Sequence, residues 1–572
     1  MATAWHNKKM LANPDPCPTC GARNLRPSTT QPLRPLRISV LLSVNNAPLR
    51  HEKPAIFDTI RNSKDILVDF DSRISEAQDI LNHLIRERTQ AASNLRDAKT
   101  LLYPIRRLPD DVLKHLFITC TRSPEACVYD SIYGDCLDEN AVPWTLSQTC
   151  RRWRSLTLET SRLWSRIDLN FDLEHTSVSR TAVAIRVGLY INRARGHDLA
   201  LVLKLSERED VSSHPVFSAL LSCTSQWKFL VVSGPVASLK VLNPCEGFLD
   251  ALRFIYININ PKQPPSPADK ILAMFRFAPH LRYVQLCNAD DAQRVLLLPW
   301  SQITLYEGSE CLSDETNHLK VLPQMSSLQS LRLFCDRPSA LPPTPSGRVN
   351  LPLLLNLTLS EGVSAHAGSL AQCFGMISAP SLSCLQLVYT HRLQISFPKI
   401  IESDAYAITT LEMVCRFDSH PDNVVGFFEM LSSMPSIYRL TVRAEGCTEG
   451  FFSKLTYRSD GNSVIPCLTS LDLHLSSFAF TEPTAFVDMV ESRRPPSMCG
   501  TTSRRFLEEV KLDKAFEMGR SLIERWYMVC DGGLLVHYGT HNMDLPRGPD
   551  ELVKPNGQNS YDGWFPGMPG TF

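Results

Sequence analysis

A short phrase of apolar positions recurs along the chain from about residue 220 onward. It reads apolar-x-x-apolar-x-apolar, and successive copies begin mostly 25 to 31 residues apart, with one step of 19 and a last step of 39. The eleven copies are Trp227/Leu230/Val232, Leu252/Ile255/Ile257, Leu281/Val284/Leu286, Trp300/Ile303/Leu305, Leu328/Leu331/Leu333, Leu354/Leu357/Leu359, Leu382/Leu385/Leu387, Ile408/Leu411/Met413, Ile437/Leu440/Val442, Leu468/Leu471/Leu473 and Leu507/Val510/Leu512. Because apolar positions alternate at the end of each copy, each copy predicts one β-strand.

Signals between the copies predict that a turn or a helix precedes each strand. Proline lies two residues before the phrase at Pro279, Pro352, Pro380, Pro435 and Pro466, where it ends a helix and feeds a strand. Amphipathic stretches precede several copies, over residues 268–277, 423–433 and 484–493. A strand plus a helix at this period is typical of a leucine-rich-repeat solenoid, which we predict for residues 200–515.

The array is expected to be irregular. The asparagine or cysteine of the repeat consensus falls in place only at Asn260. We therefore expect leucine ladders and packed helices to hold the turns together. The alternative is an ordinary α/β domain with leucine-rich strands. In either case the fold class is α/β.

Residues that lie between or beside the apolar positions of each strand are predicted to line the concave face of the sheet. This face is the candidate binding surface of the array. The candidate contact residues are Arg282, Tyr283, Gln285, Arg332, Tyr438, Arg439, Asp472 and His474.

A heptad pattern predicts a helix over residues 71–102. Ile74, Leu81, Leu95 and Leu102 recur at multiples of seven residues, and residues 77, 84, 91 and 98 (three alanines and a leucine) form the interleaved series. Such a seam either associates weakly with another copy as a coiled coil or packs on the helices that follow it. Arg88 on the seam and the three alanines weaken a zipper, so the sequence favours the second interpretation. Pro104 ends the helix near residue 103.

Three pieces of a helical module follow over residues 105–167. The first, Leu108-Pro109-Asp110-Asp111, places proline and aspartates where they suit a helix start. An apolar stripe that contains Val112, Leu113, Leu116 and Phe117 continues it. The second piece is LSQTCRRWR, from Leu146 through Cys150 and Trp153, and the third is Leu163-Trp164.

Together these pieces resemble an F-box, and the order of heptad helix, F-box and leucine-rich repeats resembles the large F-box families of mushroom-forming fungi. The resemblance implies a substrate receptor of a cullin-RING (SCF-type) ubiquitin ligase, docked on a Skp-type adaptor and through it on a cullin. It implies an adaptor protein and not an enzyme, with no cofactor. The implied adaptor anchors are Leu108, Pro109, Val112, Leu113, Phe117, Leu146, Cys150, Trp153, Leu163 and Trp164. A repeat scaffold outside ubiquitin transfer is the main alternative, and an unrecognised enzyme is the least favoured.

Composition narrows this picture. Lys plus Arg and Asp plus Glu are both 59 in 572 residues, so no net field draws the chain to nucleic acid or an anionic membrane. No phosphate-binding loop, zinc-protease helix or nucleophile elbow is present. The 18 cysteines have no regular spacing, and no apolar run is long enough to span a membrane, so we expect an intracellular protein, cytoplasmic or nuclear. Residues 1–65 are predicted to be disordered and the Gly/Pro-rich residues 531–572 to be a loop-like tail.

Overall fold

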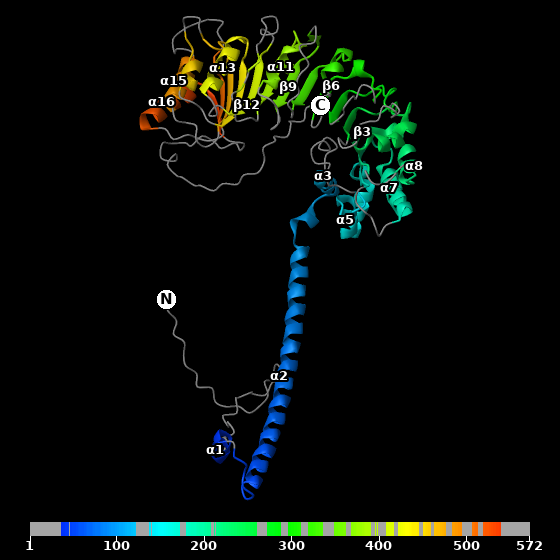
Figure 1. Ribbon diagram of the computed structural model, residues 1–572, viewed down its shortest axis with the longest axis vertical. Coiled ribbons are helices and arrows are strands. Elements are labelled where there is room, and N and C mark those ends of the chain that lie inside the picture. Colours follow the sequence, from blue (N-terminus) through cyan, green and yellow to red (C-terminus); the bar gives the residue numbers. More distant parts are fainter. Residues whose placement is uncertain are drawn as a thin grey trace. The chain divides into compact units, whose positions relative to one another are not determined.

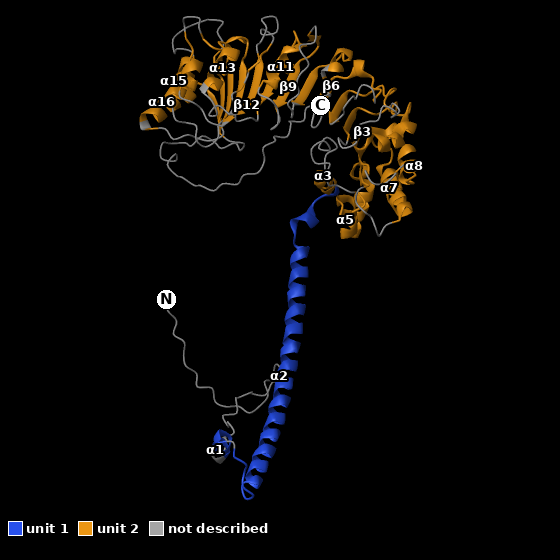
Figure 2. Cartoon of the chain, viewed as in Figure 1, with its two compact units in different colours: residues 1–112 blue, residues 113–572 orange. Residues whose placement is uncertain are grey.

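The computed structural model describes residues 36–44, 46–121, 136–138, 140–171, 179–206, 211, 213–259, 272–287, 296–310, 318–335, 348–361, 368–389, 395, 397–398, 408–416, 421–445, 450–458, 463–475, 483–494, 506–512 and 519–538. The chain divides into two compact units, residues 1–112 and 113–572 (Figure 2). The predictions for residues 1–35 and 539–572 lie outside the described residues.

The first unit is dominated by one long helix. Helix α1 (Leu36–Val44) precedes helix α2 (Lys53–Leu101), which runs for 49 residues, and a 3-10 turn, η1 (Pro104–Arg107), follows (Figure 1). The helix ends just before Tyr103-Pro104, as the sequence predicts. It begins earlier than the predicted residue 71, so residues 53–65, like residues 36–44 of α1, are helical although residues 1–65 were predicted to be disordered. The physical reason is that Pro54 suits the first turn and the heptad pattern extends upstream through Ile60 and Leu67.

Short helices open the second unit. Helix α3 (Asp110–Cys120) crosses the boundary between the units, and α5 (Val142–Thr149), α6 (Arg151–Glu159) and η2 (Ser161–Trp164) follow it. Asp110 and Asp111 lie in the first turn of α3, where their charge favours the helix dipole. Helix α7 (Arg180–Ala194) comes after the first strand of the sheet.

The rest of the second unit is built on one sheet of fourteen parallel strands, which follow one another in chain order. The strands are β1 (Arg166–Asn170), β2 (Leu199–Lys204), β3 (Trp227–Gly234), β4 (Phe254–Ile259), β5 (Tyr283–Cys287), β6 (Leu305–Glu310), β7 (Ser330–Cys335), β9 (Asn356–Glu361), β11 (Cys384–Val388), β12 (Thr410–Arg416), β13 (Arg439–Glu445), β14 (Ser470–Leu475), β15 (Glu509–Leu512) and β16 (Leu535–Tyr538). Two short strands, β8 (Val349–Asn350) and β10 (Ile377–Ser378), pair separately.

Helical segments alternate with these strands along the array (Figure 1). They are α8 (Val216–Leu221), α9 (Val236–Leu239), α11 (Ser369–Gly375), α13 (Pro421–Ser432), α14 (Phe451–Leu455), α15 (Pro483–Ser492) and α16 (Arg520–Asp531), with 3-10 turns η3 (Thr224–Gln226), η4 (Lys240–Cys245), η5 (Trp300–Gln302), η6 (His318–Lys320) and η7 (Leu322–Gln324). A parallel sheet in chain order that alternates with helices is the pattern of a leucine-rich-repeat-like solenoid. The predicted fold class is confirmed.

The register of the strands aligns the second and third apolar positions of neighbouring copies. Leu331 pairs with Leu357, which pairs in turn with Leu385. The same alignment holds for ten of the eleven predicted copies. These residues are buried, so each new strand extends the ladder of its predecessor.

The predicted copy Trp300/Ile303/Leu305 is wrong, because it is placed three residues too early in the chain. In β6 it is Tyr306 that pairs with Leu331, and Gly308 pairs with Leu333. The last position of this copy is therefore a glycine, which no search for apolar residues finds. The His318 ring fills the space that a side chain at position 308 would take. A Cβ added to Gly308 would lie only 2.7 Å from that ring. The His318 Nδ1 lies 2.6 Å from the Tyr306 hydroxyl.

The sheet extends beyond the predicted repeat region of residues 200–515 at both ends. Strand β1 uses Trp164, Ile167 and Leu169 as a further copy of the phrase, and Ile167 pairs with Leu201 of β2. Strand β16 pairs with β15 through Val536 and lies within the region predicted to be a tail. The first copy matches the apolar pattern but overlaps the residues assigned to the helical module, and the last has glycine at its first position, so neither was predicted as a repeat.

Aromatic side chains connect the helices of the last repeats. Phe427 of α13 stacks on Phe451 of α14 with centroids 5.9 Å apart. The column continues from Phe452 to Phe486 of α15 at 5.2 Å, and from Phe486 to Trp526 of α16 at 5.5 Å. These contacts pack each of these helices against the next.

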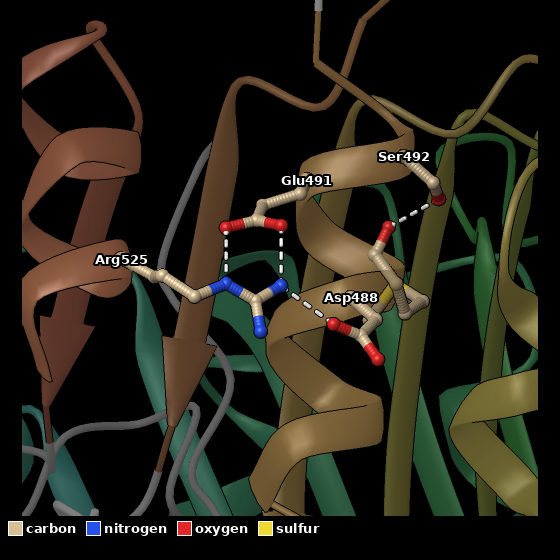
Figure 3. A network of polar contacts seen from close by, with 5 residues as sticks. Asp488, Glu491, Ser492 and Arg525 are labelled. Carbon is tan, nitrogen blue, oxygen red and sulfur yellow. Dashed lines mark hydrogen bonds and ion pairs between the residues drawn. The ribbon is translucent and has the colours of Figure 1, made fainter. Parts of the chain in front are cut away.

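An ion-pair network also joins α15 to α16. The Arg525 guanidinium donates to both Glu491 oxygens, at 3.0 and 2.5 Å, and to Asp488 at 2.5 Å (Figure 3). The hydrogen bonds that these carboxylates accept raise the pKa of Arg525 further above its usual value. The bidentate geometry fixes the register of the two helices on each other.

We predict that Gly308→Ala destabilises the protein although it moves the sequence closer to the repeat pattern. The added Cβ clashes with the buried His318 ring, at a cost of about 1–3 kcal/mol in the free energy of unfolding. In a His318→Ala background the same substitution should cost much less. Urea unfolding of the four chains measures this coupling. An equal loss in both backgrounds would contradict the packing described for β6.

Candidate functional site

The helical start of the second unit has its own small core. Leu113 and Phe117, on one side of α3, are buried. The Phe117 ring lies 4.9 Å from the Trp153 ring of α6. An ion pair between Lys114 and Glu159, at 3.1 Å, joins the same two helices on the surface. Leu113 and Phe117, predicted as adaptor anchors, are therefore used within this chain.

Trp164 lies where this helical core meets the sheet. Its ring centroid is 5.2 Å from that of Trp144 and 5.1 Å from that of Tyr190, and the Arg193 guanidinium lies 4.3 Å from the ring centre. The Trp164 indole N–H donates to the Thr157 carbonyl at 2.9 Å. Burial lowers the pKa of Arg193.

Trp164 is fully buried in this cluster, and its neighbour Leu163 is also buried. Neither side chain reaches the surface. Their burial identifies both residues as part of the junction between the helices and β1.

The other predicted anchors keep some exposure. Val112 is 39% exposed, and Pro109 and Cys150 are also exposed. Leu108, Leu146 and Trp153 are half-buried. Leu116, one turn after Val112 on α3, is 39% exposed as well. Leu116 belongs to the stripe seen in the sequence but not to the predicted anchors, because the helical spacing alone does not say which side of the helix faces outward.

Cys150 caps helix α6. Its Sγ accepts a hydrogen bond from the Trp153 backbone N–H at 3.5 Å. The Arg154 guanidinium donates to the Ser147 carbonyl at 2.8 Å and connects α6 to α5. Arg154 thus helps to hold the two helices together.

The buried phrase residues all lie on one face of the sheet. The residues that alternate with them lie on the opposite face, the second sheet face, which is the second candidate surface. Tyr283 and Gln285 lie on it in β5, Arg332 in β7, Arg439 in β13, and Asp472 and His474 in β14. Arg282 and Tyr438 come one residue before β5 and β13. The Arg282 guanidinium donates to the Pro279 and Leu281 carbonyls, each at 2.9 Å, and so holds the turn.

Three predicted contact residues converge on Glu307. The Tyr283 hydroxyl donates to the Glu307 carboxylate at 3.0 Å, and the Gln285 amide donates to it at 2.8 Å. Arg332 lies 3.7 Å from the same carboxylate. Burial raises the pKa of Glu307, and Arg332 and Tyr283 oppose the rise. The sequence pattern does not identify Glu307, because the shifted copy in β6 hides its position on this face.

The composition of the second sheet face changes along the array. At its start, Val202, Val231 and Phe254 form an apolar cluster, with Tyr256 and Tyr283 packed against it. The Phe254 and Tyr283 rings are 4.6 Å apart. Tyr256 and Tyr283 offer apolar contacts here, beside the Arg166–Asp168 ion pair of β1 on the same face, whose atoms lie 2.9 Å apart.

Toward its end the second sheet face is charged. Arg443 pairs with Glu412 at 3.4 Å, and His474 with Asp472 at 3.0 Å. Glu509 accepts a hydrogen bond from Ser470 at 2.9 Å and lies 3.1 Å from Lys511. Burial raises the pKa of Glu509, but these hydrogen bonds outweigh it, so the net shift is downward. A face with paired charges of both signs is suited to a protein surface more than to a polyanion.

Glu361 is a buried carboxyl group with a raised pKa on the buried side of the repeats. It ends β9, and the Leu370 N–H at the start of α11 lies 3.5 Å from its carboxylate. Burial raises the pKa of Glu361 to about 7. The hydroxyl of the neighbouring Tyr389 is also buried, and burial raises its pKa well above the usual value.

Within the described residues, no group of three or more His, Cys, Asp or Glu side chains could hold a metal ion. The described helices include none that is long and apolar enough to cross a membrane.

Comparison with models of known protein families finds no family model that matches the chain, and comparison with curated proteins finds no match either. The structure by itself defines the class. It is an α/β protein in which a long helix precedes a parallel fourteen-stranded sheet in a leucine-rich-repeat-like solenoid pattern.

We predict that Glu361 makes stability depend on pH. Its pKa is raised in the folded state, so its full contribution to stability is present below pH 4.5 and is lost as pH rises toward 7. Glu361→Gln removes the penalty of charging a buried carboxylate and should stabilise the chain at pH 8 by about 2–3 kcal/mol. At pH 4.5 the two chains should be nearly equal. Denaturant unfolding at both pH values tests this, and a Glu361→Gln chain that is less stable than wild type at pH 8 would contradict it.

Proposed function

We propose that this chain is a substrate-recognition subunit of an SCF-type ubiquitin ligase. In this proposal the module of residues 105–167 docks on a Skp-type adaptor, which links it to a cullin, and the second sheet face binds a target protein. The observation that carries the proposal is the surface of α3. Leu113 and Phe117 satisfy the core of the second unit, and Val112 and Leu116 add an exposed apolar strip beside them.

A helix with an apolar strip that its own core does not use is suited to the groove of another protein. Because the sequence resembles an F-box, we propose that this groove is on a Skp-type adaptor. Of the predicted anchors, the ones with exposed or half-buried side chains are the candidates for direct contact: Leu108, Pro109, Val112, Leu146, Cys150 and Trp153. Leu113, Phe117, Leu163 and Trp164 would act indirectly, by holding the helices in place.

Catalysis would lie in the partners, and no cofactor is part of the proposal. A receptor of this kind raises the effective concentration of target lysines near the charged conjugating enzyme. The second sheet face supplies a recognition surface with an apolar end around Tyr256 and a charged end around Glu509. A target that matches both ends would present an apolar segment followed by charges of both signs.

A second candidate function is a repeat scaffold outside ubiquitin transfer. The burial of Trp164 between the helices and β1 favours it, because the helical module then also serves to cap the array. The two functions differ in whether a Skp-type adaptor and a cullin co-purify with the chain.

We predict that Val112→Glu/Leu116→Glu lowers affinity for a Skp-type adaptor at least tenfold, because two charges enter the proposed apolar contact. The matched control is Ile185→Glu/Leu189→Glu, which makes the same change at two exposed apolar positions one turn apart on α7, outside the module. Adaptor capture by purified full-length chains, quantified by titration, measures the difference. Point variants are preferable to deletion of residues 105–167. That deletion would also remove two core residues, Ile167 of β1 and Trp164 just before it.

Equal capture by the two double variants would contradict the placement of the contact on α3. Capture of neither adaptor nor cullin by the wild-type chain would favour the scaffold.

A further inference from the structure

Helix α2 exposes more apolar surface than a helix normally leaves in water. None of its 49 residues is buried. Leu67 is 59% exposed, Leu81 56% and Leu95 58%. Most of the stability of a protein helix comes from packing of its apolar face, so a helix of this length and surface requires a partner.

Six large exposed apolar residues of α2 follow a heptad over nearly the whole helix, and four others, Phe57, Val68, Ile85 and Leu101, lie off it. With Ile74 as position a, the a positions are Ile60, Leu67, Ile74, Leu81, Arg88, Leu95 and Leu102, and the d positions are Ile56, Ser63, Phe70, Ala77, Leu84, Ala91 and Ala98. The seam is thus longer than the residues 71–102 that the sequence pattern first indicated. A sustained a/d seam is the surface of a coiled coil.

The two halves of the seam differ in size. Six of the seven a residues are leucine or isoleucine, and four of the seven d residues are alanine or serine. In a parallel pair, a faces a and d faces d, so Ala77, Ala91 and Ala98 would each face their own copy and leave gaps. Arg88 would also face Arg88 of the other chain. In an antiparallel pair, a faces d, and most large side chains meet a small one.

We propose that α2 binds α2 of a second copy of this chain in an antiparallel coiled coil. Nearly full overlap of the two helices pairs the large a residues with the d residues of the other copy: Ile60 with Ala98, Leu67 with Ala91, Ile74 with Leu84, Leu81 with Ala77, and Leu95 with Ser63. Arg88 then faces the Phe70 ring of the second copy, a cation–π contact in place of a repulsion.

Flanking charges fit the same alignment. Arg73 and Glu87 occupy g positions, and in this overlap Arg73 of one copy lies beside Glu87 of the other. Symmetry makes this ion pair twice. The match of charge and of side-chain volume together points to a second copy in preference to an unrelated helix. The assembly would be bivalent, with two recognition units that raise avidity for repeated targets.

The mass of the full-length chain in solution tests this inference. Wild type should sediment at twice 64.3 kDa, and Leu67→Glu/Leu81→Glu at 64.3 kDa. The matched control, Val68→Glu/Asn82→Glu, shifts the same charges by one residue off the seam and should stay dimeric. Equal helix content by circular dichroism shows that the variants fold. A wild-type mass of 64.3 kDa at every concentration, or monomers from both variants, would overturn the proposal.

The orientation has its own test. Chains with Ile60→Cys are mixed with chains with Ala98→Cys, treated with a short thiol crosslinker and mapped as peptides. The antiparallel pair predicts links between positions 60 and 98 of different chains. Links of 98 to 98, or none at either position, would overturn it. The proposed ligase function does not enter either measurement, so the two proposals fail separately.

Discussion

The register of parallel strands is the constraint on which the rest of the second unit depends. Each strand hydrogen-bonds to the strands before and after it in the sheet, so the buried phrase residues of one turn stack directly on those of the next. No single turn can bury its leucines alone, and the core exists only because the ladder continues. The same register places Tyr283, Gln285 and Arg332 around Glu307 on the other face. The polar cluster on that face is therefore a consequence of core packing.

Most of the array was predictable because leucines that recur at strand spacing, one set per 25 to 31 residues, are typical of stacked parallel strands and of few alternative folds. The failures have physical causes. In β6 a core position of the phrase is Gly308, which is not apolar. The core volume there is supplied by His318 from a different segment of the chain. Glu307 was missed with it, and so was the centre of the polar cluster. A search of local apolar spacing does not detect a side chain that fills a gap from a distant position.

The helical module shows the other limit of sequence reasoning. Spacing identifies the apolar stripe of α3 but not which residues face the core, and the structure buries Leu113 and Phe117 while Val112 and Leu116 remain exposed. Trp164 ends the helical module and also starts the first repeat. Its packing against Trp144 and Tyr190 places it at the junction between the two, which the sequence pattern does not show. Burial thus divides the predicted anchors into residues that build the module and residues that stay accessible to a partner.

We propose that the helical module both caps the solenoid and presents the exposed apolar strip of α3 to an adaptor. Amide hydrogen exchange of the full-length chain, with and without a purified Skp-type adaptor, tests that claim most directly. The account predicts that the adaptor slows exchange in residues 110–120 and leaves strands β9 to β14 unchanged. Unchanged exchange in α3 at saturating adaptor would contradict it.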